Sequence, residues 1–465
     1  MHIGSLGIFE GGPLRDQHGR LRTDAVRSEI ESRLHLVPKL RRRVQFLSLG
    51  AAAPSWVDDP HFDIANHVVE TTLASPGTEE ALHELCADLM SRPLKRDQPL
   101  WEIWLVDGLD SGQVALIEKL HHSMADGLAG VELVTVLFDL DRHPTRSHCS
   151  SSPWQPVPPP ASASIVTNDL VRRAAVPLHM VSNGIGLVRH PLRVGREFAH
   201  YAEGIRTLLT RKTIAPSSSL NVQIGERRRM EVIRQPLGEL HQVARSFRVT
   251  INDLLLTTVA EGIHLLMVSR GVDVEERTVQ VLVPVGAEHH ADHQLGNRVS
   301  AMLVRLPIGR SDPMKRLRSV AAAQASSKDH HQALAGVVLL NLAEPLSQPV
   351  VAAAAHLVHR QPFCNLIVTN VPGPDFPLYV LGARMLEAFP IVPLVGNLTV
   401  GVAILTYDGQ LTVGLLADPD ACPDLDVFAD GIRHSLAKLV AANMRSNGGS
   451  ESTLVERSVH RDTSS

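Results

Sequence analysis

The sequence predicts an α/β protein of two domains. Three observations carry this: the length, the alternation of strand-like and helical patterns, and a Pro/Ser-rich break after the first third of the chain. At 465 residues the chain exceeds one ordinary hydrophobic core, so two domains of roughly 200 residues each are expected. Hydrophobic residues make up 44% and charged residues 20%, which is the composition of a globular protein. Two such domains can form a cleft between them.

Residues 1–141 are predicted to form the first domain. Residues 102–106 and 114–120 each have the composition of a strand, and turn residues separate them, which predicts a hairpin. From Leu128 onward apolar residues recur at helical spacing, so residues 126–127 are placed at a strand-loop-helix junction.

Residues 142–216 are predicted to be a linker, Pro/Ser-rich at first and then a helical crossover, and residues 217–445 a second α/β domain. The polar residues 446–465 are predicted to be a disordered tail. The second domain has five strong strand patterns, at 279–285, 298–306, 365–371, 398–406 and 411–416, and the last two are joined by a hairpin turn at Asp408-Gly409.

Composition excludes several classes of protein. The four cysteines are scattered without a CxxC pair, which argues against a disulfide framework or a zinc site and favours a reducing cytoplasm. A formal net charge of -4 offers no basic face for nucleic acid. No signal core and no run approaching 18 apolar residues is visible, so neither secretion by a visible signal nor a membrane span is expected. Peripheral lipid contact stays open, because residues 176–192 mix apolar residues with Arg and His.

The chemically most informative segment is HHSMADG at residues 121–127. A histidine titrates near neutrality, so His122 could take a proton from an alcohol while its oxygen attacks an acyl carbon. A thioester donor suits this chemistry because thiolate is already a good leaving group. Asp126 could anchor the loop or cap the following helix, and Gly127 would allow close backbone approach.

Histidines alone do not establish a catalytic site, since the chain contains 24 of them and two other adjacent pairs, at 289–290 and 330–331. Residues 289–293 lie in polar surroundings that favour a loop, with weak metal binding as a remote alternative, and no metal site is predicted. For 121–127 the residues leave two interpretations open, a catalytic base or a buried polar loop.

The pattern HHxxxDG resembles the signature of the CoA-dependent acyltransferase superfamily. That superfamily includes chloramphenicol acetyltransferase, the condensation domains of peptide synthetases, and bacterial wax ester synthase/diacylglycerol acyltransferases. Further blocks resemble the last family and follow its order along the chain: Pro99-Leu100-Trp101, Asn252-Asp253, Gly296-Asn297, and TNVPGP at 369–374. The ordered set is far more specific than the histidine motif alone.

The resemblance implies two chloramphenicol-acetyltransferase-like domains joined by a crossover, with the active site in a tunnel between them. It implies His122 as the base, with His121 and Asp126 maintaining the site. Asn252 is implicated in activity, although a place at a helix N-terminus explains it equally well. Trp101 is interpreted as a packing residue, and residues 370–374 as turn-forming. Gly127, Gly296 and Asn297 are predicted to border the substrate.

The resemblance implies acyl-CoA as cosubstrate, no cofactor, and a lipid alcohol as acceptor. Diacylglycerol giving triacylglycerol is the first choice, and a long-chain alcohol giving wax ester the second. The alternatives are a condensation-type enzyme with a carrier-bound donor and a non-catalytic lipid-binding relative. The expected location is the cytoplasm, with peripheral contact at the inner membrane or lipid inclusions.

Two departures from the family pattern stand out. The family usually carries a segment before the Met-His-Ile-Gly block with which this chain begins, so the expectation is either a start codon misassigned to an internal methionine or a truncated protein. The family often has Ser-Tyr-Asn-Gly where this chain has TYDG at 406–409, a conservative change within a turn.

Overall fold

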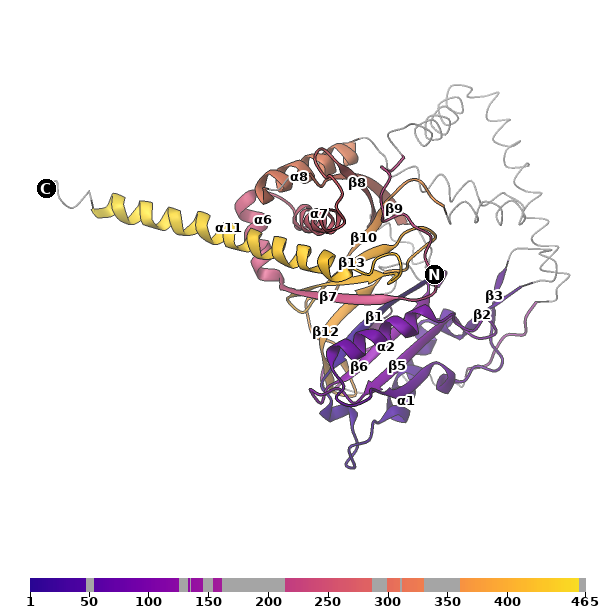
Figure 1. Ribbon diagram of the computed structural model, residues 1–465. Coiled ribbons are helices and arrows are strands. Elements are labelled where there is room, and N and C mark those ends of the chain that lie inside the picture. Colours follow the sequence, from indigo (N-terminus) through magenta and orange to yellow (C-terminus); the bar gives the residue numbers. More distant parts are fainter. Residues whose placement is uncertain are drawn as a thin grey trace, which may run out of the picture.

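The structure is a computed structural model that describes residues 1–46, 54–124, 133, 135–144, 154–160, 214–286, 299–309, 312–329 and 360–459. Its described part is a mixed α/β fold built on two six-stranded sheets, with helices packed against them (Figure 1). The first sheet has the order β11-β12-β1-β6-β5-β4. Its strands are β1 (His2–Phe9), β4 (Val68–Thr72), β5 (Trp101–Asp107), β6 (Val114–His121), β11 (Tyr379–Val380) and β12 (Ala383–Ile391).

The second sheet has the order β7-β14-β13-β10-β8-β9, and a separate two-stranded hairpin joins β2 to β3. The strands of the second sheet are β7 (Arg229–Pro236), β8 (Thr278–Gly286), β9 (Val299–Pro307), β10 (Leu366–Pro372), β13 (Val400–Tyr407) and β14 (Gln410–Ala417). The hairpin consists of β2 (Arg42–Gln45) and β3 (Ser55–Asp58), and it projects from the first half of the molecule (Figure 1).

Helices cover both sheets, and short 3-10 turns connect elements of the first half. The α-helices are α1 (Thr23–Arg33), α2 (Glu79–Ser91), α6 (Leu237–Phe247), α7 (Ile251–Ser269), α8 (Pro313–Asp329) and α11 (Leu425–Val459). The 3-10 turns are η1 (Gly12–Leu14), η2 (Leu34–Leu36), η3 (Pro38–Arg41) and η5 (Ile64–Asn66). Figure 1 shows α6, α7, α8 and α11 grouped on the second sheet, and α2 beside β5 and β6 of the first.

The predicted strands of both halves are confirmed to within two residues at either end. The hairpin between β13 and β14 turns at Asp408 and Gly409, as expected, with φ of 45° and 79°. Two consecutive residues with positive φ match the twist of the flanking strands, and Asp and Gly tolerate that conformation.

The two sheets do not divide the chain at a single point. β12, which falls within the predicted second domain, pairs antiparallel with β1 of the first sheet, Gly4 opposite Ile391. It also contacts the second sheet, because the Thr412 hydroxyl on β14 donates to the Ala388 carbonyl oxygen at 2.6 Å. A strand's hydrophobic pattern indicates which face is buried but not which distant strand it pairs with. The sequence therefore predicted an α/β domain at 217–445 but not that one of its strands joins the first sheet.

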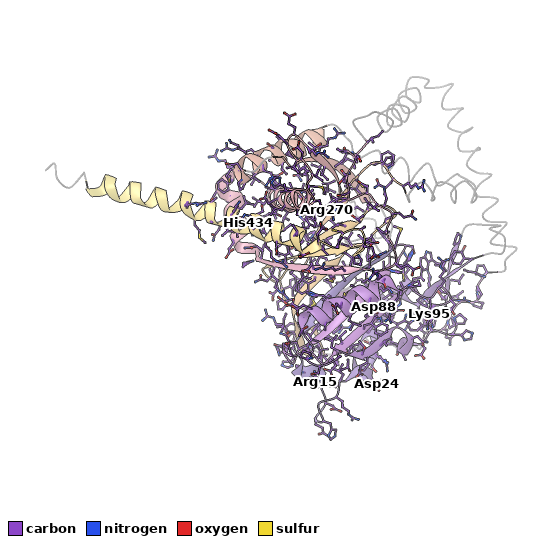
Figure 2. All side chains as sticks on the ribbon, in the orientation of Figure 1. Arg15, Asp24, Asp88, Lys95, Arg270 and His434 are labelled. Atoms are coloured by element: carbon purple, nitrogen blue, oxygen red, sulfur yellow. The ribbon has the colours of Figure 1, made fainter. Side chains whose placement is uncertain are left out.

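Ion pairs close the ends of several elements. At the end of α7, Arg270 donates to Asp424 at 2.8 Å, and near the tip of the first half Arg15 donates to Asp107 at 2.9 Å. Both arginines are labelled in Figure 2 and lie on opposite halves of the molecule. These contacts fix loops of the scaffold.

Helix α7 is the most apolar long helix among the described residues. The helix has 19 residues, and an 18-residue window within it has a mean hydropathy of 1.4, so it is long and apolar enough to cross a membrane by length and composition. However, 72% of that window is buried inside the molecule, where α7 is surrounded by α6, α8, α11 and the second sheet. Burial in the protein core accounts for its composition.

Helix α11 is longer than the sequence predicted. Residues 446–459, expected to be disordered, continue it, and the helix projects beyond the body of the molecule (Figure 1). Its first half is nucleated by buried side chains such as Phe428 and Ile432. Once a helix is nucleated, each further residue adds one hydrogen bond, and no proline interrupts this stretch.

Candidate active site

Strand β6 places the histidine pair at one end of the first sheet. It lies between β1 and β5, with His121 opposite His2 and Leu120 opposite Trp101. His121 is the last residue of the strand, and His122 is the first residue beyond it. The predicted position at a strand end is therefore confirmed. A loop at the end of a rigid strand is a common place for catalytic groups.

The chain turns sharply at the pair. The Met124 N–H donates to the His121 carbonyl oxygen at 2.8 Å, so His122 and Ser123 are the central residues of a β-turn. The His121 N–H donates to the Leu100 carbonyl at 2.9 Å, and the His122 N–H to the Met1 carbonyl at 3.1 Å. The backbone of the histidine pair is therefore held by Leu100 through His121 and by Met1 through His122.

A side chain from a distant part of the sequence completes the turn. The Lys39 ammonium group donates to the Ser123 carbonyl oxygen at 3.1 Å and to the Met124 carbonyl oxygen at 2.8 Å. The Met124 side chain is buried beneath the turn. The turn is thus anchored by main chain, by a charged side chain and by apolar packing.

The His121 ring has a defined tautomer. The Ser123 N–H donates to its Nδ1 at 3.2 Å, and the Ser123 hydroxyl lies 2.8 Å from the same atom. A backbone N–H can only donate, so Nδ1 is an acceptor and the proton of the neutral ring is on Nε2. Burial lowers the pKa of His121, which favours this neutral form. His121 therefore stabilises the turn through Ser123.

His2 and Lys119 support the same strand end. The His2 and His121 rings meet edge to face with centroids 6.1 Å apart, and His2 Nδ1 lies 3.2 Å from the Met90 carbonyl oxygen. Burial, together with Lys119, lowers the pKa of His2 to about 4, so its ring is neutral at pH 7. The Lys119 ammonium donates to the Leu89 carbonyl at 2.7 Å, which joins the end of α2 to β6.

His122 differs from these neighbours. It is partly exposed, and among the residues that the structure describes none hydrogen-bonds its imidazole. Its backbone is fixed while its ring nitrogens stay available in the described surroundings. That combination suits a group that must exchange a proton with a bound substrate.

The other predicted site residues separate into two groups. Asp126, Gly127, Gly296 and Asn297 lie outside the described residues. Asn252 is described: it is the second residue of α7 and has no contact with the histidine pair among the contacts of the described residues. Its role in activity stays a prediction.

The cap of α7 is made by residues on either side of Asn252. The Thr250 hydroxyl accepts from the Asp253 N–H at 3.1 Å, and the Asp253 carboxylate accepts from the Thr250 N–H at 2.9 Å. This reciprocal pair is a capping box, and it satisfies two otherwise unpaired helix N–H groups. The helix-capping role thus belongs to Thr250 and Asp253, and the Asn252 amide is not used for it.

Two single variants test whether helix capping depends on Asp253 and not on Asn252. Asp253→Ala is expected to lower the free energy of unfolding by about 1 kcal/mol, because it removes a cap, and Asn252→Ala to change it by less than about 0.5 kcal/mol. Urea unfolding checks both values. If Asn252 contributes to activity, acyl transfer falls in Asn252→Ala at nearly wild-type stability. Equal stability loss in both variants would instead assign Asn252 to the helix end alone.

Trp101 is a packing residue, as predicted. Its side chain is 2% exposed, its Nε1–H donates to the Leu40 carbonyl at 2.8 Å, and its ring stacks on His67 with centroids 4.5 Å apart. The stack continues to Phe62 and then to Trp154, whose ring meets Phe62 edge to face. Trp154 belongs to the predicted linker, so the described part of that linker is anchored on the first half.

The block at 369–374 corrects a detail. Residues 370–374 were expected to form a turn, but Asn370 to Pro372 are the last residues of β10, where Asn370 pairs with Ile404 of β13. The chain leaves the sheet only at Gly373. A Cβ there would lie 2.3 Å from the Thr406 carbonyl oxygen, so the close approach of two strands requires glycine.

Three residues near the histidines were missed from sequence. Ser123 lies inside the motif as a variable position, and His2 depends on the pairing of β1 with β6. Lys39 belongs to the basic run PKLRRR, which resembles an ordinary solvated surface. No sequence signal links Lys39 to a turn more than eighty residues away.

Solved structures with the same fold define the class. The chain superposes on the wax ester synthase/diacylglycerol acyltransferase from Marinobacter aquaeolei VT8 with a TM-score of 0.65 at 20% identity, covering 95% of each chain. The first condensation domain of the calcium-dependent antibiotic synthetase gives 0.58 at 16% identity, covering 95% of this chain and 91% of that one. The fold is therefore the two-domain, chloramphenicol-acetyltransferase-like fold.

Sequence comparisons give the family within that class. Residues 1–255 match the wax ester synthase/diacylglycerol acyltransferase catalytic domain, and residues 295–440 match the C-terminal domain of the same family. A probable diacylglycerol O-acyltransferase of Mycobacterium tuberculosis is 35% identical over 450 residues, covering 95% of this chain and 92% of the relative. The chain belongs to the wax ester synthase/diacylglycerol acyltransferase family and is an acyltransferase.

Proposed function

We propose that this acyltransferase transfers the acyl group of a long-chain acyl-CoA to diacylglycerol and so forms triacylglycerol. The proposal rests on the placement of His122. This residue directly follows a central strand, and its backbone N–H is hydrogen-bonded. Among the described residues, none hydrogen-bonds its imidazole. Relatives named as diacylglycerol O-acyltransferases support the choice of acceptor. No cofactor takes part besides acyl-CoA as cosubstrate.

In this mechanism His122 takes the proton of the acceptor hydroxyl as its oxygen attacks the thioester carbonyl. A C–O bond forms to give a tetrahedral oxyanion, and collapse of that intermediate breaks the C–S bond. The CoA thiolate leaves and recovers the proton from the imidazolium. His121 and Asp126 maintain the site, Asn252 contributes to activity, and Gly127, Gly296 and Asn297 border the substrate.

A long-chain alcohol is the second candidate acceptor, which would make the enzyme a wax ester synthase. The structure from Marinobacter aquaeolei VT8 is named both wax ester synthase and diacylglycerol acyltransferase, which supports a long-chain alcohol as the second candidate acceptor. A condensation-type reaction with a carrier-bound donor is the alternative from another class, since condensation domains share this fold. A non-catalytic lipid-binding relative is the third.

One assay distinguishes these candidates. The purified chain is incubated with labelled palmitoyl-CoA, or in parallel with a palmitoyl thioester of an acyl carrier protein, together with dipalmitoylglycerol, hexadecanol or no acceptor. Free thiol release and products are followed. Triacylglycerol formation with acceptor-dependent thiol release supports the proposal, and preferential wax ester formation supports the second acceptor. Turnover only with an acyl-carrier-protein thioester would support a condensation-type enzyme, and palmitoyl-CoA binding without any product the non-catalytic relative.

The acceptor's poor solubility in water bears on location. We propose that the enzyme works in the cytoplasm and meets its lipid substrate peripherally, at the inner membrane or at lipid inclusions. Co-sedimentation with vesicles containing dipalmitoylglycerol, compared with empty tubes, measures this contact. Complete recovery in the supernatant at every lipid concentration would contradict it.

A further inference from the structure

We infer that Lys39 is a positioning residue for His122: its ammonium group fixes the peptide groups that follow the histidine and so holds the turn from which the imidazole projects. This inference rests on the proposed function, because it gives Lys39 a role in the same reaction. It adds a residue that lies outside every motif singled out from the sequence.

Two of the described contacts of Lys39 are made to one short stretch of backbone. Its Nζ lies 3.1 Å from the Ser123 carbonyl oxygen and 2.8 Å from the Met124 carbonyl oxygen. Hydrogen bonds from a charged donor are roughly twice as strong as neutral ones. Two of them on consecutive carbonyls fix the orientation of two consecutive peptide planes.

The peptide group between Ser123 and Met124 is held at both ends. Lys39 binds its carbonyl oxygen, and its N–H donates to the His121 carbonyl at 2.8 Å. That second bond closes the turn containing His122. Rotation of this peptide group would break both bonds, so Lys39 opposes opening of the turn without touching the imidazole.

Lys39 is itself held in place. Its Nζ lies 5.2 Å from the centroid of the Trp56 ring on β3, within the range of a cation–π contact. The next residue, Leu40, is buried and accepts a hydrogen bond from Trp101 of β5 at 2.8 Å. The base of the lysine side chain is thereby attached to β5, which lies beside β6 in the first sheet.

A direct substrate contact is the competing role for a lysine near an acyl-CoA site. The two roles differ in kinetics. A residue that positions the base changes kcat with little change in KM, whereas loss of a contact to the CoA phosphates raises KM for acyl-CoA with little change in kcat.

The test compares Lys39→Met, which keeps the aliphatic stem, with Lys39→Arg, which keeps the charge and donors. Lys39→Met is expected to lower kcat by about ten- to a hundredfold at unchanged KM for palmitoyl-CoA, because small displacements of a catalytic group are costly. Lys39→Arg is expected to recover part of that loss. Hydrogen exchange of the Met124 amide is expected to be faster in Lys39→Met than in wild type.

Arg42→Met is the matched control, since Arg42 lies on the neighbouring hairpin, pairs with Asp58 and is half-exposed. It is expected to keep the wild-type kcat. A third variant, Trp56→Leu, removes the ring beside the ammonium group and is expected to lower kcat less than Lys39→Met. If Lys39→Met does not fold, the kcat of Trp56→Leu tests the inference in its place, and a wild-type kcat in that variant would overturn it.

The inference is overturned by an unchanged kcat in Lys39→Met, or by a raised KM at wild-type kcat. It is also overturned if Met124 exchange is the same in variant and wild type. Failure of the proposed function looks different: the wild-type chain would then transfer no acyl group to any acceptor, while the exchange measurement on Met124 would still report whether Lys39 holds the turn.

Discussion

His122→Ala is expected to lower the rate of acyl transfer by about a hundred- to ten-thousandfold, the usual contribution of a general base. The substitution removes the imidazole but leaves the backbone bonds of the turn, in which His122, among the described residues, takes part through its N–H. Because no described residue hydrogen-bonds the ring, the free energy of unfolding is expected to change little. The measurement is thiol release from palmitoyl-CoA with dipalmitoylglycerol, alongside urea unfolding.

The control for this variant is His434→Ala. His434 is exposed on α11 and labelled in Figure 2, on the half of the molecule opposite to β6. It is expected to keep wild-type turnover. Wild-type turnover in His122→Ala would remove His122 as the base, and a large loss of stability there would assign the residue to the scaffold.

The second large expected effect is a dependence of the free energy of unfolding on pH, caused by Glu118 on β6. Its side chain is 7% exposed on the apolar face of the sheet, and the described contact to its carboxylate is the Ser5 hydroxyl at 2.8 Å. Burial raises the pKa of Glu118 from 4.5 to about 7. The folded chain therefore holds this proton more tightly than the unfolded chain does.

The sign of the effect follows from that difference. Stability contributed by the protonated carboxyl is fully present below the unfolded pKa of 4.5 and is lost as pH rises through about 7. Glu118→Gln imitates the protonated form at every pH. We expect it to be more stable than wild type by about 3 kcal/mol at pH 8 and by under about 1 kcal/mol at pH 5.

Urea unfolding of both proteins at the two pH values measures this difference. Glu84→Gln is the control, because Glu84 is exposed on α2, and its effect is expected to be small at both pH values. An equal difference between wild type and Glu118→Gln at pH 5 and pH 8 would contradict a raised pKa. Lower stability of Glu118→Gln at pH 8 would show that the ionised carboxylate is stabilised by its surroundings.

Local patterns predicted most of the strands and the site's central feature. Residues 114–120 have a continuous apolar pattern that ends at two histidines, and β6 with its terminal turn follows from that pattern. The capping role of Thr250 and Asp253 also has a short-range signature. Such features were predictable because the interactions that produce them lie within a few residues of one another.

The features that could not be predicted depend on contacts between distant segments. Nothing near Lys39 indicates the carbonyl groups that it binds, and nothing in residues 383–391 indicates β1 as their partner. The continuation of α11 past its buried half is a third case, since the polar composition there predicts a disordered tail. Each of these requires the assembled fold.

The pairing of β12 with β1 has a consequence for the order in which the molecule forms. During synthesis β1 emerges long before β12, its partner on one side, because β12 lies near the other end of the described residues. Until then β1 is an open sheet edge, which can pair with other chains. A fragment ending at residue 141 would keep that edge permanently, so we expect it to aggregate, and adding residues 379–391 as a separate peptide to restore its solubility.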